Sequence, residues 1–137
     1  MASPIADLPA ALADRIRREA KAAHPGECCG LIEGARAGNI FHITALHRAR
    51  NLAADADRFD IDPRDHLDAS KAARANGTHI IGCYHSHPNG VARPSARDLA
   101  GAGEENFLWL IATATEIAAF VYLCGGFVSA VCTISSE

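Results

Sequence analysis

At 137 residues the chain has the length of a single domain and can bury a substantial hydrophobic core without disulfides or structural metals to hold it. Hydrophobic residues make up 49% and charged residues 21%, the ordinary mixture of a soluble globular protein. The formal net charge is −3 and the Lys and Arg residues are scattered, so composition gives no basis for binding nucleic acid or an acidic membrane.

The N-terminal segment predicts an amphipathic helix. Leu8, Leu12 and Ile16 recur every four residues, and basic side chains occupy positions between them. Asp7 is a suitable N-cap, and the sequence His-Pro-Gly at residues 24–26 ends the helix.

The later elements follow from apolar runs bounded by Pro, Gly and Asn. In chain order we expect strands at 28–34 and 39–46, a loop at 47–58, a strand at 58–62, a helix at 63–75, a strand at 79–87, a short helix at 95–101, and strands at 107–113, 117–123 and 127–134. Helices and strands are interleaved without repeats or linkers, which predicts one α/β or α+β domain over residues 1–137.

Cysteine usage points to a reducing compartment. The cysteines form an odd set without a CxxC pair, and residues 1–24 carry charges and lack the apolar core of a signal peptide. No stretch reaches about 18 uninterrupted apolar residues, so we expect no membrane-spanning helix. We therefore predict a cytoplasmic protein with free thiols at Cys28, Cys29, Cys83, Cys124 and Cys132.

The stretch HSHPNGVARPSARD, residues 85–98, carries the strongest chemical signal. His85 and His87 stand two positions apart at the end of an apolar strand, so their imidazoles share one face. Pro88 ends the strand, and Asp98 lies at a helix start that can fold back toward it. Two imidazoles and a carboxylate suit Zn²⁺ and leave a fourth position open, as in catalytic zinc sites.

Each part of this pattern also has an ordinary structural explanation. Two His at this spacing can be surface residues without a role, and Ser95-x-x-Asp98 is a capping box. The ordered combination of strand, His pair, loop and helix start favours a metal site over two coincidences. Glu27 is the candidate base for a hydrolytic water, although a solvated loop position would also suit it, and Glu33 is a weaker rival.

The pair PGECCGLIEG (25–34) and HSHPNGVARPSARD (85–98) resembles the JAMM, or MPN+, zinc metalloproteases of the JAB/MPN family, in particular the small bacterial type. RFDIDP (58–63) is similar to the segment that precedes the second helix in those members, and the resemblance runs from about residue 8 to 134. It implies a cytidine-deaminase-like α/β fold, in which helices flank a curved mixed β-sheet.

The resemblance also implies a role for each residue of the motif. His85, His87 and Asp98 hold Zn²⁺, Glu27 holds the catalytic water and acts as general base and then general acid, and Ser95 donates a hydrogen bond to the oxyanion. Cys83, which alternates in register with the two His, and the 89–93 loop could also contribute to the site.

The substrate implied is the tail of a ubiquitin-like protein. Eukaryotic deubiquitinating members carry an insertion after the SxxD helix, whereas here only residues 99–106 precede the next strand. We therefore expect a peptidase or isopeptidase that acts after the C-terminal Gly-Gly of a ubiquitin-like or sulfur-carrier protein. The alternatives are a zinc hydrolase of small peptides or amides and a non-catalytic MPN scaffold. The sequence leaves a homo-oligomer possible.

Overall fold

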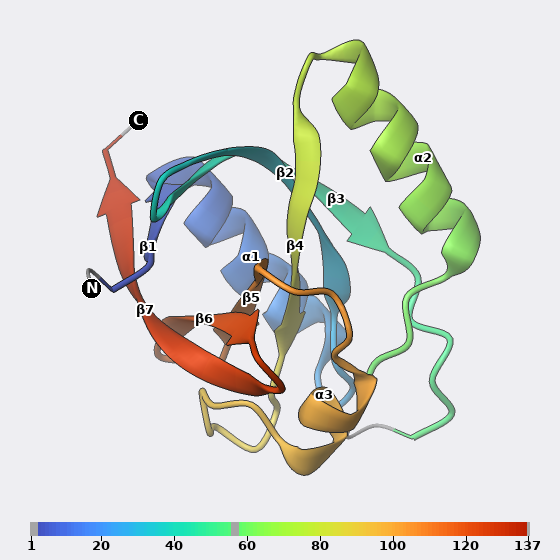
Figure 1. The fold of residues 1–137 in the computed structure, drawn as a ribbon. Helices are drawn as coiled ribbons and strands as arrows, with labels where there is room; N and C mark the ends of the chain where they lie inside the picture. Colours follow the sequence, from blue (N-terminus) through green and yellow to red (C-terminus); the bar gives the residue numbers. More distant parts are fainter. Residues whose placement is uncertain (1–2, 56–57, 137) are drawn as a thin grey trace.

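The computed structural model describes residues 3–55 and 58–136 (Figure 1). Its elements are β1 (Ile5–Pro9), α1 (Ala10–Ala23), β2 (Cys29–Ala37), β3 (Ile40–Ala49), α2 (Pro63–Ala75), β4 (His79–Ser86), α3 (Ala96–Gly101), β5 (Phe107–Ala112), β6 (Ile117–Leu123) and β7 (Gly126–Ser135). Within these residues, no helix is both long and apolar enough to cross a membrane.

The strands form one sheet in the order β1-β3-β2-β4-β5-β6-β7, and the sheet closes because β1 pairs with both β3 and β7. The pairs β1–β3, β1–β7 and β4–β5 are parallel, and the other neighbours are antiparallel. This confirms the predicted α/β domain with a mixed sheet and flanking helices. The sheet, which we expected to be curved, closes into a barrel.

The strand that closes the sheet contains residues that the sequence pattern assigned to the start of a helix, with Asp7 as its cap. The predicted helix start at Leu8 is wrong, because residues 5–9 form β1 and α1 begins at Ala10. Ala6 and Leu8 are fully buried, whereas their neighbours are partly exposed, so burial alternates along the strand. This alternation covers only five residues, and in the sequence it is a weaker signal than the helical spacing of Leu8 and Leu12. Asp7 is not the cap: its carboxylate lies 3.2 Å from His42 Nδ1 on β3.

The helices cover opposite faces of the sheet. In Figure 1, α1 lies within the ring of strands and α2 lies outside it. The inner core joins Ile16 of α1 to side chains of six strands, among them Leu8, Ile32, Phe41, Tyr84, Leu110 and Val121. The outer core packs Ala69 of α2 against Leu31, Cys83, Trp109, Ile111 and Phe120. Strand β4 contributes to both cores, so its side chains lie at the centre of the molecule.

Other boundaries also differ from prediction, and β2, for example, runs to Ala37 rather than ending at residue 34. Residues 58–62 do not form a strand, and Ile61 makes only an isolated bridge with Asn51. Strand β3 runs to Ala49, three residues into the predicted loop, because its antiparallel pairing with β2 continues to Cys29. These differences depend on long-range strand pairing, which the local sequence pattern does not indicate.

Candidate metal centre

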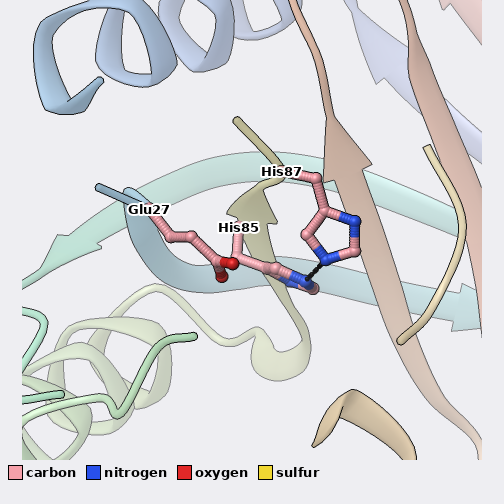
Figure 2. Close-up of side chains that lie close together, drawn as sticks. All are labelled: Glu27, His85 and His87. Atoms are coloured by element: carbon pink, nitrogen blue, oxygen red, sulfur yellow. Dashed lines mark hydrogen bonds between the residues drawn. The ribbon is translucent and has the colours of Figure 1, made fainter. Parts of the chain in front are cut away.

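At the end of β4, successive side chains lie on opposite faces of the sheet. Tyr84 lies in the inner core, where its hydroxyl donates to Glu19 Oε1 of α1 at 2.7 Å. His85 lies on the other face, against Trp109 of the outer core. His87 follows directly after β4 and, as the spacing predicted, its ring points to the same place as that of His85 (Figure 2). The period of two along the strand therefore brings the two imidazoles together.

Three potential ligand atoms converge at this point. His85 Nε2 lies 3.0 Å from His87 Nε2, and Asp98 Oδ2 lies 3.2 Å from the former and 3.0 Å from the latter. The side chains are nearly inaccessible to solvent, at 0% for His85, 6% for His87 and 5% for Asp98. A buried cluster of this kind concentrates lone pairs and negative charge, which favours a cation at its centre.

The protonation of His87 follows from its other nitrogen. Its Nδ1 lies 2.8 Å from the carbonyl oxygen of Val91, which can only accept, so Nδ1 carries a hydrogen. In the neutral imidazole, Nε2 then presents its lone pair toward Asp98 and His85. This is the arrangement by which a carbonyl fixes the tautomer and orientation of a metal-binding histidine.

Charge coupling within the cluster shifts its pKa values in opposite directions. Burial lowers the pKa of His85 despite the nearby Asp98 carboxylate. For His87 burial also acts downward, but the hydrogen bonds to Asp98 and Val91 outweigh it and raise the pKa. Burial acts to raise the pKa of Asp98, and the two imidazoles overcome it and hold that pKa well below its usual range. Asp98 is therefore a carboxylate, as a metal ligand must be.

Asp98 is aimed at the imidazoles by the start of α3. Ser95 is the N-cap: its Oγ accepts from the backbone N–H of Asp98 at 3.0 Å, and its own N–H donates to Asp98 Oδ2 at 2.9 Å. The capping box predicted from the sequence is therefore present. It uses an acceptor lone pair of the Ser95 hydroxyl and leaves the O–H available as a donor.

Glu27 reaches the cluster from the entrance of β2. It is 6% exposed, and a carboxylate oxygen lies within 4.8 Å of ligand nitrogens of His85 and His87, toward which it points in Figure 2. Its backbone is held by Asn51, whose Nδ2 donates to the Glu27 carbonyl at 3.0 Å, and by Ser86, whose Oγ accepts from Cys28 N at 2.9 Å. Neither Asn51 nor Ser86 was identified from the sequence, since ordinary polar residues carry no signal of such long-range contacts.

The donor set fits zinc. Zinc in proteins takes imidazole nitrogen and carboxylate oxygen at roughly 2.0–2.2 Å, so tetrahedral ligand atoms lie about 3.3 Å apart. The observed separations of 3.0–3.2 Å between the two Nε2 atoms and Asp98 Oδ2 need little adjustment to reach this value. His85, His87 and Asp98 could therefore hold the ion, and Glu27 would stand beside it.

Cavities of different size are lined by residues of this group. The larger, of about 760 Å³, is lined by Asp98 and Cys83 together with the aromatic rings of Phe59, Phe107 and Trp109. The smaller, of about 330 Å³, is lined by Glu27, His87 and Ser95 and by residues of the 88–94 loop. Glu27 also lines a third cavity, of about 510 Å³. The structure thus brings the five predicted site residues together, and their individual roles stay predictions.

The remaining candidates from the sequence lie in other surroundings. Cys83 is buried beside the cluster, and burial raises the pKa of its thiol, with Asp98 acting in the same direction. Glu33, the rival base, faces away from the site and accepts from Thr78 Oγ1 at 2.7 Å and Asn76 Nδ2 at 3.1 Å, while His47 Nε2 lies 2.8 Å away. All five cysteines are free.

A family model described as prokaryotic homologs of the JAB domain matches residues 9–123. The chain belongs to this family, which confirms the resemblance seen in its two motifs.

Individual proteins are also similar to this chain. Desampylase of Haloferax volcanii is 32% identical over 88 residues, which cover 64% of this chain and 62% of the relative. Tail tip assembly protein K of Escherichia phage N15 is 31% identical over 104 residues, covering 75% of this chain and 39% of the phage protein. The chain thus spans less than two thirds of these curated relatives. A solution structure from Desulfitobacterium hafniense has a TM-score of 0.87 at 30% identity and covers 96% of this chain and 94% of its own.

Proposed function

We propose that this protein is a zinc-dependent metallopeptidase or isopeptidase that hydrolyses the amide bond after the C-terminal Gly-Gly of a ubiquitin-like or sulfur-carrier protein. The observation that carries the proposal is the convergence of His85, His87 and Asp98 beside the buried carboxylate of Glu27. Such a constellation supplies three metal ligands, an open side and a base, the parts that metal-assisted hydrolysis requires.

The metal supplies Lewis-acid chemistry when it is bound, polarising the scissile carbonyl and promoting the nucleophilicity of water at neutral pH. Glu27 takes a proton from the attacking water as the new C–O bond forms. It then delivers that proton to the amide nitrogen as the C–N bond breaks, so that proton count is unchanged over the cycle. Ser95 donates its free O–H to the carbonyl oxygen as negative charge develops there.

The substrate class rests on the relatives and on the shape of the site. The Haloferax relative is named as an enzyme, desampylase, which supports hydrolysis as the activity of the JAB domain in this chain. The connection from α3 to β5 is short, from Ala102 to Asn106, and residues of the cluster line cavities at the surface. An extended tail such as Gly-Gly, which has no bulky side chains, suits an approach to this buried cluster. We also propose that residues 1–137 act as one JAB/MPN domain with a cytidine-deaminase-like arrangement.

A second candidate function is a scaffold. The phage relative is named for tail tip assembly, which supports an assembly role as an alternative for this chain. A zinc hydrolase of small peptides or amides is the third possibility, since neither cavity is larger than about 760 Å³.

One assay separates these functions. Zinc-loaded protein is incubated with a sulfur-carrier protein extended past its Gly-Gly, and the mass of the carrier is followed over time. We expect cleavage after Gly-Gly, and a loss of about 10²–10⁴-fold in rate for Glu27→Gln with zinc still bound. Glu33→Gln makes the same chemical change at Glu33, the other buried glutamate considered as the base. We expect this variant to retain the activity.

The other outcomes assign the alternatives. Bound zinc without cleavage of the carrier, but with release from short peptide amides, would establish the small-substrate hydrolase. Protein that does not take up stoichiometric zinc would favour the scaffold.

A further inference from the structure

The side-chain amide of Asn51, near the entrance of β2, uses its full hydrogen-bonding capacity. Its Nδ2 donates to the carbonyl oxygens of Glu27 at 3.0 Å and Arg58 at 3.2 Å. Its Oδ1 accepts from the backbone N–H groups of Ala53 and Asp60, each at 2.9 Å. An asparagine side chain offers two N–H donors and two acceptor lone pairs, so every position of this amide has a partner. It therefore connects segments that are separate in the chain.

One of these segments carries Phe59, whose ring is stacked on the imidazole of His85. Asn51 holds the backbone on both sides of that ring, because two of its hydrogen bonds go to the residue before Phe59 and the residue after it. The same turn is closed by a backbone hydrogen bond from Leu52 N to Asp60 O at 2.7 Å. Since the backbone conformation restricts the side-chain rotamer, the amide governs where the aromatic surface lies against His85.

The other segment carries Glu27, whose carbonyl oxygen belongs to the same peptide group as the N–H of Cys28. Asn51 donates to the oxygen of this group, and the N–H donates to Ser86 Oγ at 2.9 Å. Ser86 lies between the two histidines at the end of β4, so the peptide group is held from β4 on one side and by Asn51 on the other. A peptide group is planar, and fixing both of its polar ends restricts the direction in which the Glu27 side chain leaves the backbone.

We propose that Asn51 is a positioning residue that couples the base to the metal ligands. Its amide orients the Glu27 side chain through the peptide group, and the His85 imidazole through the aromatic ring that packs on it. The role at Glu27 rests on the proposed function, whereas the role at His85 concerns metal binding alone. Hydrolysis depends on the relative placement of base and metal, and a displacement of about 1 Å can cost on the order of 10²-fold in rate.

The first measurement concerns the metal and needs no substrate. Asn51→Ala should lower zinc affinity by about 10- to 100-fold in a chelator competition and should shift the visible spectrum of the Co²⁺-substituted protein. Because this effect passes through Phe59, combining Asn51→Ala with Phe59→Leu should cause little loss beyond that of either change alone. Unchanged affinity in Asn51→Ala, or losses that multiply in the double variant, would overturn the inference.

The second measurement concerns Glu27. In Asn51→Ala the Cys28 N–H should exchange with solvent about 2- to 10-fold faster, the equivalent of one hydrogen bond lost from its peptide group. At saturating zinc, kcat on the extended sulfur-carrier protein should fall by about 10²-fold with KM unchanged. Phe59→Leu leaves this peptide group in place and should keep its slow exchange. If wild-type protein does not cleave the carrier, the proposed function fails, and the zinc and exchange measurements still decide on Asn51.

Asn76→Ala is the matched control, because it removes another amide, whose Nδ2 donates to Glu33 at 3.1 Å and not to the residues of the metal site. It should lower the free energy of unfolding without changing zinc affinity, the Co²⁺ spectrum or the exchange of Cys28. If this control also speeds the exchange of Cys28, the effect belongs to lost stability, and the inference is overturned.

Asn51→Asp tests the inference in a variant that keeps more of the structure. Its carboxylate can still accept from Ala53 and Asp60, but it cannot donate to the Glu27 carbonyl. We expect the Asp60 N–H to stay protected while the Cys28 N–H exchanges faster. Slow exchange of Cys28 in this variant would show that Asn51 does not hold the peptide group of Glu27.

Discussion

The imidazole of His85 is stacked on the ring of Phe59, with centroids 4.3 Å apart and planes inclined by 22°. The edge of Trp109 contacts the same imidazole, at 5.7 Å between centroids. Among the described residues, His85 Nδ1 has no hydrogen-bond partner. Metal-binding histidines usually donate this second N–H to a carboxylate or carbonyl, which fixes the ring. In the zinc site that we propose, aromatic packing takes over that task.

Phe59→Leu should therefore weaken zinc binding. Leucine keeps the apolar character but removes the flat surface that holds the His85 ring, so the Nε2 lone pair is less well aimed. We expect zinc affinity to fall by about 10- to 100-fold, the usual effect of losing a group that orients a ligand. Competition with a chromophoric chelator measures this affinity, and the visible spectrum of the Co²⁺-substituted protein reports the ligand geometry.

Two variants show whether the stack itself is responsible. Phe59→Tyr retains the ring and should restore both affinity and spectrum. Phe107→Leu alters another aromatic residue of the larger cavity and should leave both unchanged. An unaltered zinc affinity and Co²⁺ spectrum in Phe59→Leu would refute the positioning role.

Asp98→Asn separates the metal from the helix cap. The asparagine oxygen can still accept from Ser95 N–H, so α3 keeps its cap, but the negative charge at the two imidazoles is lost. Zinc at 100 times its Kd should raise the free energy of unfolding of the wild type by about 2.7 kcal/mol, and the variant should gain far less. Thermal unfolding after chelator treatment, with and without added zinc, measures the difference.

The control for this change is another buried aspartate that caps a helix. Asp62 accepts from Arg64 N at the start of α2, and Asp62→Asn should keep the full stabilisation by zinc. If zinc raises the free energy of unfolding of Asp98→Asn as much as that of the wild type, Asp98 is not a zinc ligand.

Ser95→Gly tests the hydroxyl apart from the cap. Glycine is a tolerable N-cap and costs only a few tenths of a kcal/mol, whereas the hydrogen-bond donor is removed completely. We expect kcat to fall by about 10²–10³-fold, as for loss of an oxyanion donor. Ser95→Thr keeps hydroxyl and cap and should retain activity. If Ser95→Gly retains its kcat, Ser95 serves only as the cap. Steady-state kinetics combined with urea unfolding distinguish these outcomes.

Glu33 should make stability depend on pH. Burial alone would raise the pKa of this carboxyl, but hydrogen bonds from Thr78, His47 and Asn76 outweigh it and lower the pKa below its ordinary value of 4.5. Since the folded state holds the proton less tightly than the unfolded state, the stabilisation is complete above that value. It is lost as the pH falls through the lower pKa of the folded protein.

Glu33→Gln should therefore cost about 1–3 kcal/mol at pH 7, through disrupted buried hydrogen bonds. The difference from wild type should shrink as the pH is lowered below 4.5. Urea unfolding at several pH values measures it, with Glu116→Gln as an exposed control. A difference that stays constant with pH would show that the charge of Glu33 contributes nothing.

Local pattern was a good guide wherever neighbours in sequence decide the structure. The period of two along β4 places His85 and His87 on one side, and the Ser95–Asp98 capping box forms as its spacing predicts. Residues 5–9 show the limit of such patterns. Five residues form a strand only because β3 and β7 lie on either side, and the helical spacing of Leu8 and Leu12 gave the opposite prediction.

Local sequence patterns account for the kinds of candidate ligand and their local geometry, namely two imidazoles on a strand end and a carboxylate in a helix cap. Which glutamate faces them depends on long-range strand pairing. In the antiparallel pairing of β2 with β4, Cys29 lies opposite His85 and Glu33 opposite Ile80. Glu27, two residues before Cys29, therefore reaches the metal cluster, and Glu33 is carried toward the other end of β4. Strand register joins residues almost 60 positions apart, and it is fixed by the packing of the whole sheet rather than by any local pattern.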